Sequence, residues 1–136
     1  MTIRKFAQSL LFIPLFAVLV AGCHSVHKAP AITGTGIYLL NVPLPADAVV
    51  EFKWVETTST GEVTNVIDTL QLRNIRRAPI PFEIPYNPSG IKRSKYYAIT
   101  CEIRSGDKVL FRSIRPFQVL THGSPENVEV ILEKVL

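Results

Sequence analysis

The sequence predicts an all-β fold, a single antiparallel β-sandwich or small barrel of seven to eight short strands, placed after an N-terminal signal peptide. Apolar and polar residues alternate in several short runs, as they do in half-buried strands, and turn-forming residues separate the runs. No stretch of helical length shows apolar residues at a spacing of 3.6. Short strands that recur in this way are typical of sandwiches and small barrels.

The first 22 residues form the predicted signal peptide. Arg4 and Lys5 precede an uncharged segment, residues 6–21, whose centre is almost entirely aliphatic or aromatic. A basic start, a short apolar run and small residues before a cut site are the features of a secretory signal. A transmembrane helix is the alternative, but it needs about 20 apolar residues, and this run is shorter and contains Pro14.

The predicted cut site resembles the lipobox of bacterial prolipoproteins, with an aliphatic residue, two small residues and a cysteine in Val20-Ala21-Gly22-Cys23. The resemblance implies cleavage between Gly22 and Cys23, and acylation of Cys23 by a diacylglyceryl group and a further chain such as palmitate. His24 in place of Asp favours the outer membrane, by resemblance to enterobacterial lipoproteins. Two or three acyl chains hold a protein on a membrane without spanning it. We therefore expect a lipid-anchored protein that faces the periplasm from the outer membrane.

The mature chain is expected to consist of a lipidated tether, residues 23–31, and one β domain, residues 32–136. What remains after the signal is enough for one domain and too little for two. With Cys23 acylated, Cys101 is the one thiol left, so an intramolecular disulfide is excluded; a Cys23–Cys101 bridge is the alternative. Cys101 falls on the inward face of its predicted strand and is expected to be an inert core thiol.

The strands are expected where alternation is clearest. They are predicted over residues 34–40, 49–56, 66–72, 78–86, 96–103, 109–114 and 117–120, with a last strand whose inner face carries Val128, Val130 and Leu132. Alternation is poorer in the third run, where Asp68 falls in phase with Leu70 and Leu72.

The run at residues 78–86, APIPFEIPY, carries a second signal besides alternation. Its even-numbered residues are all apolar, and three of its odd-numbered residues are Pro79, Pro81 and Pro85. Alternate residues of a strand direct their N–H groups to the same side, so the three prolines remove donors from one edge. We therefore predict a strand at the edge of the sheet, unpaired on its odd-numbered side and protected against the addition of a partner strand.

Charge gives little support to an anionic partner. Once the signal is removed, the formal net charge falls from +4 to about +2, so a nucleic-acid-binding function is not supported. Two local basic clusters exist, and we interpret them as solvated loops rather than as an anion site. They are Arg73, Arg76 and Arg77, and Lys92, Arg93 and Lys95.

No constellation in the sequence supports catalysis, so we expect a protein that is not an enzyme and uses no cofactor. His24 and His27 flank the tether and lack a fixed third ligand, so no metal site is predicted. A nucleophilic pair of Cys101 and His122 would need an exposed thiol. Trp54 is interpreted as a core residue rather than a platform for carbohydrate.

Three segments resemble the YbaY/YscW family of small bacterial lipoproteins. They are PIPFEIPYNPSGI (79–91), YYAITCEIRSGDKVLFRS (96–113) and VLTHGSPENVEVILEKV (119–135). The resemblance implies a β-sandwich on a lipid tether. Some members are pilotins of type III secretion, which act as chaperones that guide a secretin subunit to the outer membrane, and others are envelope lipoproteins of unclear role.

Two functions therefore compete. The first is a monomeric pilotin that binds a secretin subunit; the second is an accessory envelope lipoprotein with a structural or ligand-binding role and no secretin partner. A pilotin would hold its partner either as a helix in a groove or by strand addition, and the prolines disfavour strand addition at residues 79–85. That leaves the opposite sheet edge or a face. The partner surface is not identified by the sequence: Tyr38, Leu40, Val49 and Val55 are candidates that are equally compatible with the core.

Overall fold

In the computed structural model of this protein, residues 22, 25 and 27–136 are described, and their regular structure is almost entirely β. The strands within these residues are β1 (Ala31–Tyr38), β2 (Ala48–Thr57), β3 (Val63–Leu72), β4 (Ile80–Pro85), β5 (Tyr96–Ser105), β6 (Lys108–Ser113), β7 (Phe117–Val119) and β8 (Asn127–Lys134). A single turn of 3₁₀ helix, η1 (Pro88–Gly90), lies between β4 and β5. The all-β prediction is confirmed.

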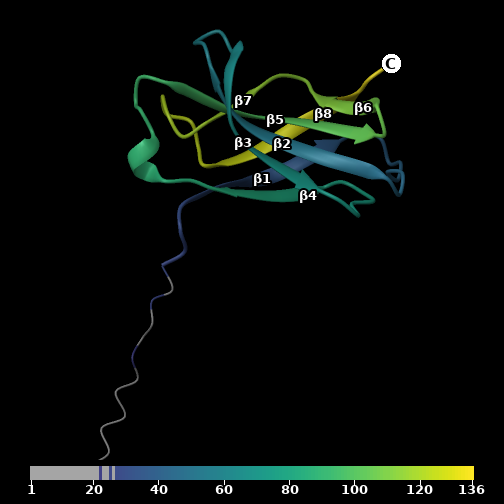
Figure 1. Ribbon diagram of the computed structural model, residues 1–136, viewed down its shortest axis with the longest axis horizontal. Helices are drawn as coiled ribbons and strands as arrows, with labels where there is room; N and C mark the ends of the chain where they lie inside the picture. The colour runs from purple at the N-terminus through teal and green to yellow at the C-terminus, as the bar shows by residue number, and fades with distance from the viewer. Residues whose placement is uncertain (1–21, 23–24, 26) are drawn as a thin grey trace, which may run out of the picture.

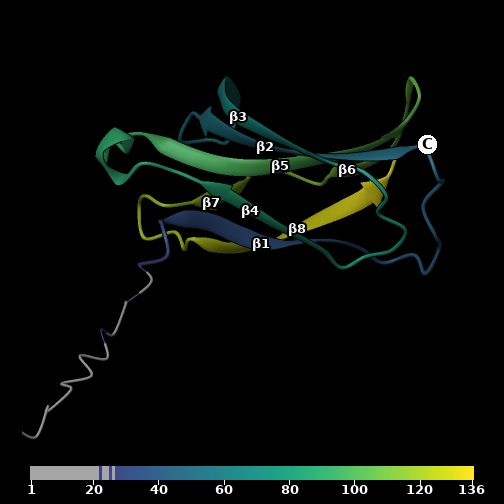
Figure 2. The same cartoon turned by 60° about the horizontal axis from the view of Figure 1, so that its bottom comes forward.

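The strands form one sheet in the order β3-β2-β5-β6-β8-β1-β4, and the short β7 also pairs with β5. Every pairing is antiparallel except that of β1 with β8, which is parallel. The sheet curls so that β2, β3 and β5 lie over β1, β4 and β8 (Figures 1 and 2). The result is a barrel that is nearly closed, with an open seam between its two end strands, β3 and β4.

Pairing shifts several strand ends from their predicted positions. β1 begins at Ala31 rather than Gly34 and ends at Tyr38 rather than Leu40, because its first residues pair with the end of β4, Ala31 opposite Pro85. β3 likewise begins at Val63, three residues earlier than predicted, because Val63 pairs with Thr57 at the end of β2. The pairing of Ala31 with Pro85 joins distant segments and is not visible in a local pattern.

The core fills the inside of the barrel with the inward side chains of the strands. Phe52 of β2 stacks on Phe82 of β4, with ring centroids 4.2 Å apart, and so joins the two layers across the barrel. Tyr38 stacks on Phe111 at 4.4 Å. Both Tyr38 and Val55 are buried, so of the apolar residues whose direction the sequence left open, these two belong to the core.

The edge prediction for the proline-rich strand is confirmed. β4 ends the sheet order, and among the described residues its one partner strand is β1. The Tyr86 N–H donates to the Pro30 carbonyl oxygen at 3.1 Å, so even-numbered residues direct their backbone groups toward β1. By alternation Pro79, Pro81 and Pro85 direct theirs away from it.

The parallel pair β1–β8 depends on a glycine. A Cβ added at Gly34 would lie 1.9 Å from the Val128 carbonyl oxygen, which is backbone and cannot turn aside. Gly34 therefore permits the close approach of β1 and β8 on which barrel closure depends.

We predict that Gly34→Ala lowers the free energy of unfolding by about 3 kcal/mol, because the new methyl group overpacks the β1–β8 pair. Gly90→Ala is the matched control, since a Cβ there has no atom within 4 Å. Urea unfolding of the two variants measures both effects. A Gly34→Ala protein as stable as the Gly90→Ala protein would contradict the close approach.

Candidate functional site

The segment before β1 leaves the barrel at one end, called here the tethered end (Figure 1). Cys23, the predicted lipidation residue, and most of the predicted signal peptide lie outside the described residues; Gly22, before the predicted cut, is described and exposed. Residues 24–30 span at most about 25 Å when fully extended. An anchor at Cys23 would thus hold the tethered end close to the bilayer. Residues 27–136, with residues 22 and 25, contain no helix of the length and hydropathy needed to cross a membrane.

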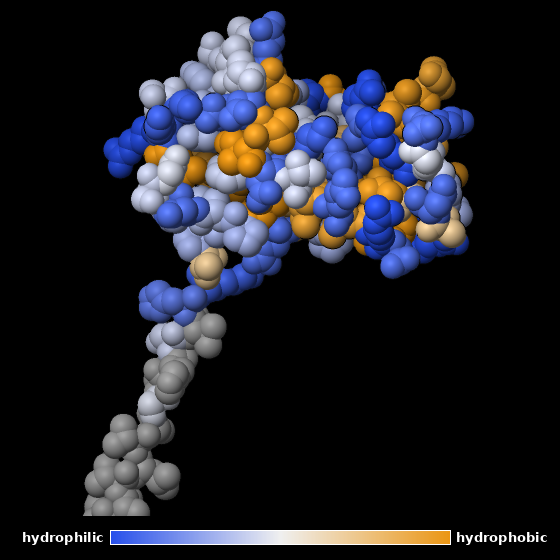
Figure 3. Space-filling view, in the orientation of Figure 1, coloured by the Kyte–Doolittle hydropathy of each residue, from blue (hydrophilic) through white to orange (hydrophobic). Residues whose placement is uncertain are grey.

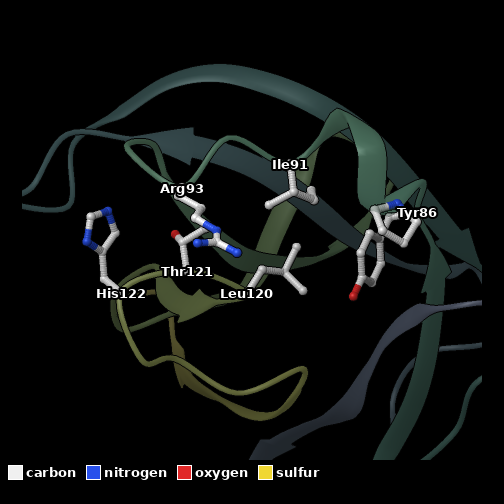
Figure 4. A pocket seen from close by; sticks show the side chains of 7 residues that line it. Tyr86, Ile91, Arg93, Leu120, Thr121 and His122 are labelled. Atoms are coloured by element: carbon white, nitrogen blue, oxygen red, sulfur yellow. The ribbon is translucent and has the colours of Figure 1, made fainter.

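A groove of about 470 Å³ opens at the tethered end. It is built from two connections, residues 86–95 between β4 and β5 and residues 120–126 between β7 and β8. The lining side chains shown in Figure 4 include Tyr86, Ile91, Arg93, Leu120, Thr121 and His122. The groove lies beside the tether, because Tyr86 is hydrogen-bonded to Pro30.

Side chains of the two connections fix the shape of this groove. The Tyr86 hydroxyl donates to Glu126 Oε1 at 2.8 Å. Burial, followed by this bond and the Glu126 charge, raises the pKa of Tyr86. Thr121 Oγ1 donates to the Lys95 carbonyl oxygen at 2.6 Å, and the His122 ring stacks on Tyr96 with centroids 3.8 Å apart.

The groove combines an apolar lining with exposed nitrogen-bearing side chains. Ile91 and Leu120 are partly buried and pack against the core, whereas Arg93 and His122 are exposed. Such a surface suits an amphipathic segment of another molecule. The sequence indicated turns at both connections, but it could not indicate that they meet, and the groove was therefore missed.

The two predicted basic clusters lie far apart in the fold. Arg73, Arg76 and Arg77 lie in the connection between β3 and β4, and Lys92, Arg93 and Lys95 lie between β4 and β5. The cluster residues are exposed except for Lys95, which is half-buried and pairs with Glu56 at 2.9 Å. This exposure agrees with the interpretation as solvated loops.

Cys101 and His122, which were considered as a nucleophilic pair, do not lie together. Cys101 is 2% exposed, and burial, followed by the nearby Glu102 and Glu51 charges, raises the pKa of its thiol. His122 stacks on Tyr96, which precedes Cys101 by five residues, or about 17 Å, along β5. In the described part of the chain, no three His, Cys, Asp or Glu side chains gather in a way that could hold a metal ion.

Trp54 is a core residue, as interpreted from the sequence. Its ring is tilted against those of Tyr86 and Tyr97, with centroids 6.1 and 5.9 Å away. Because Trp54 is buried, it offers no exposed face on which a sugar could stack.

Exposed apolar side chains mark a second surface, on β3. Val63, Val66 and Ile67 are 49%, 47% and 37% exposed. Figure 3 shows hydrophobic atoms gathered over β3 on the face toward the viewer. Of the candidates for partner binding named from the sequence, Leu40 is 46% exposed and Val49 is half-buried.

Comparisons with known proteins relate this chain to one protein family and to one solved structure. Residues 27–132 match the model of a family described as type III secretion system lipoprotein chaperone (YscW). The structure is similar to that of an alternative pilotin from the type II secretion system of Vibrio cholerae, with a TM-score of 0.70 and 24% sequence identity over 80% of this chain and 99% of that chain. At this identity the likeness shows the fold. A search of curated proteins gives no match.

We predict that Cys101 resists alkylation in the folded protein. In a Cys23→Ser chain, where Cys101 is the sole cysteine, iodoacetamide at pH 8 should modify almost none of the thiol, because the thiolate is disfavoured and access is closed. The same chain in 8 M urea provides the control and should be modified fully. Mass spectrometry measures both, and rapid modification without urea would contradict the buried position.

Proposed function

Since the chain belongs to the YscW family of type III secretion system lipoprotein chaperones, we propose that it is a pilotin. In this role it binds a secretin subunit, and its lipid anchor carries the complex to the outer membrane, where the secretin assembles. The role requires two parts, a means of reaching the membrane and a surface that holds a protein.

The family match carries the proposal. It covers residues 27–132, which include the strands β1 to β7 in full and β8 as far as Leu132. The likeness to the Vibrio cholerae type II pilotin adds support at the level of fold, because that protein bears the same architecture on 99% of its chain. A family of chaperones indicates a binding role rather than a catalytic one.

The anchor in this proposal is Cys23, acylated after cleavage behind Gly22. One myristoyl chain gives only reversible membrane binding, whereas two or more hold a protein durably. A diacylglyceryl cysteine with a third chain meets this condition. The described chain begins its first strand at Ala31, so the tether keeps the barrel near the membrane while the strands remain in the periplasm.

We predict that Cys23→Ser removes secretin multimers from the outer membrane, and that deletion of the gene has the same effect. Without acyl chains the protein keeps its partner surface but has nothing to hold it at the membrane, so the subunit is not delivered. Membrane fractionation followed by immunoblotting for heat-resistant secretin multimers measures the effect.

Cys101→Ala is the matched control, since it changes the other cysteine of the chain and should leave multimers in the outer membrane. If multimers assemble normally in the deletion strain, the chain is not a pilotin. The role as an accessory envelope lipoprotein would then remain.

A further inference from the structure

The end of the barrel opposite the tethered end exposes a cluster of apolar side chains. Leu39, Leu40 and Val42 lie in the connection between β1 and β2, residues 39–47, and are 90%, 46% and 44% exposed. This connection and the one between β3 and β4, residues 73–79, lie together at that end (Figures 1 and 2). Single exposed apolar residues are ordinary, but three within four positions form a patch of the kind that marks interaction sites.

Hydrogen bonds hold the connection between β1 and β2 in one shape. The Tyr38 hydroxyl donates to the Val42 carbonyl oxygen at 3.1 Å, and the Leu44 N–H donates to the Arg76 carbonyl oxygen at 2.7 Å. Leu44 is buried, so its side chain fastens the connection to the core. The exposed apolar residues therefore lie on a loop whose shape is fixed before any partner arrives. A preformed surface loses less conformational entropy when it binds.

Two grooves at this end share Leu40 and Val42 in their linings. The first has a volume of about 170 Å³ and also contains Arg77, whose guanidinium donates to Asn41 Oδ1 at 3.3 Å. The second has a volume of about 220 Å³ and lies against the ends of β6 and β8. We call the two grooves together the distal surface. Its exposed apolar residues and its charged residues are Leu39, Leu40, Val42, Arg77, Lys108 and Lys134.

Every charged residue that lines the distal surface is basic. Arg77, Lys108 and Lys134 are exposed, and none of them forms an ion pair with another of the described residues. Arg73 and Arg76, also exposed, add positive charge beside them. The acidic groups at this end line neither groove; they are Asp47, Asp107, Glu133 and the carboxyl group of Leu136. A partner therefore meets apolar side chains bordered by positive charge.

Charge distinguishes the possible occupants. Two copies of this chain that met through their distal surfaces would bring like charges together, which is unfavourable. A second copy could offer the acidic β3 instead, but a contact between two different surfaces extends into an open series of copies unless it closes into a ring. A different chain with apolar and acidic residues complements both the patch and its basic border, because opposite charges steer and orient a partner.

The place of the distal surface in the fold also favours a protein partner over the membrane. The proposed anchor at Cys23 would hold the tethered end near the bilayer, and the distal surface lies at the other end of the barrel (Figure 2). It is therefore turned toward the periplasm, where a subunit in transit is met.

We propose that the distal surface binds an acidic, amphipathic segment of the secretin subunit. The inference rests on the proposed function, and it names the surface by which the chain holds its partner. The apolar side chains of the segment pack on the patch around Leu40, and its Asp or Glu side chains lie beside Arg77, Lys108 and Lys134. Side-chain contacts rather than a strand ladder hold the segment.

We predict that Leu40→Ser and Lys134→Glu each weaken this binding about tenfold, which corresponds to about 1.4 kcal/mol. Leu40→Ser removes the apolar side chain that the two grooves share, and Lys134→Glu turns an attraction into a repulsion. The probes are overlapping 20-residue synthetic peptides that cover the secretin subunit of the same secretion system. Fluorescence anisotropy measures their affinity for the chain.

Two variants are matched controls. Val66→Ser removes an apolar side chain on β3 that is 47% exposed, against 46% for Leu40. Lys92→Glu reverses the charge of an exposed lysine at the tethered end. Both should bind the peptide as the unchanged chain does. Urea unfolding confirms that all four variants are folded, and the exposed position of Lys134 keeps the test valid if Leu40→Ser does not fold.

The salt dependence of binding provides a second measurement. Raising the ionic strength from about 0.1 M to about 1 M shortens the Debye length from about 10 Å to about 3 Å. The unchanged chain should then bind the peptide several-fold more weakly, because the attraction to the basic border is screened. Lys134→Glu should show a smaller loss, since it has already lost part of that attraction.

Three results overturn the proposal within the peptide experiment. They are equal binding by the unchanged chain, Leu40→Ser and Lys134→Glu; binding only of peptides that lack Asp and Glu; and binding of no peptide. Phosphatidylglycerol vesicles that bind the Cys23→Ser chain in place of a peptide, and do so through Lys134, overturn it in favour of a lipid surface. A chain that sediments as an oligomer, and as a monomer with Leu40→Ser, overturns it in favour of a second copy.

Failure here is distinguishable from failure of the proposed function. If secretin multimers still require the chain but are indifferent to Leu40→Ser and Lys134→Glu, the pilotin role stands and the distal surface is wrong. If multimers do not require the chain at all, the pilotin role is wrong.

Discussion

The shortage of backbone donors along one edge of β4 is the constraint on which the rest of the structure depends. The sheet curls far enough to bring its two end strands to a common seam. A ladder across that seam would need N–H groups at positions where Pro81 and Pro85 have none. The barrel therefore stays open, and the inward side chains of the same strand, such as Phe82, still complete the core. β4 thus contributes its inward face to the core and forms the end of the sheet with its other edge.

β1 determines at which end of this barrel the N-terminal segment leaves. It pairs with β4 on one side and with β8 on the other, and Gly34 allows the latter approach. Its first residue lies opposite Pro85, so the tether emerges next to the connection that follows β4. The β2–β3 hairpin reaches the same end, where Lys95 pairs with Glu56. From there β3 runs toward the far end, where Leu72 pairs with Val50.

Local patterns in the sequence were sufficient for the fold class and for one edge. Two patterns within β4 were enough for these predictions. The even-numbered apolar residues indicate which face of the strand is buried, and the odd-numbered prolines indicate which of its edges is unpaired. Cys101 was likewise placed in the core by the alternation of β5 alone. The weak alternation at Asp68 also has a local cause: on an exposed edge strand, a carboxylate in phase with Leu70 remains in water.

What the sequence could not supply depends on contacts between distant segments. The parallel pair β1–β8 joins residues about ninety positions apart, and the groove needs two connections that no pattern relates. Tyr38 was ambiguous because apolar residues flank it on both sides, and Val55 because it follows the apolar Trp54 at a bulge in the β2–β3 pairing, so parity alone does not give their direction. The prediction for Cys23 needs no such contacts. It rests on a short local motif in the sequence, and Cys23 itself lies outside the described residues.

A carrier must hold its membrane more strongly than its cargo, and the chemistry of the proposed role allows this. Each CH₂ of a buried acyl chain contributes about 0.8 kcal/mol, so two or three chains would give an anchor that does not dissociate during delivery. A single protein hydrogen bond contributes only about 1 kcal/mol net, because it replaces bonds to water. A grip on a protein partner that relies on a few such bonds would therefore be released more readily than the lipid anchor.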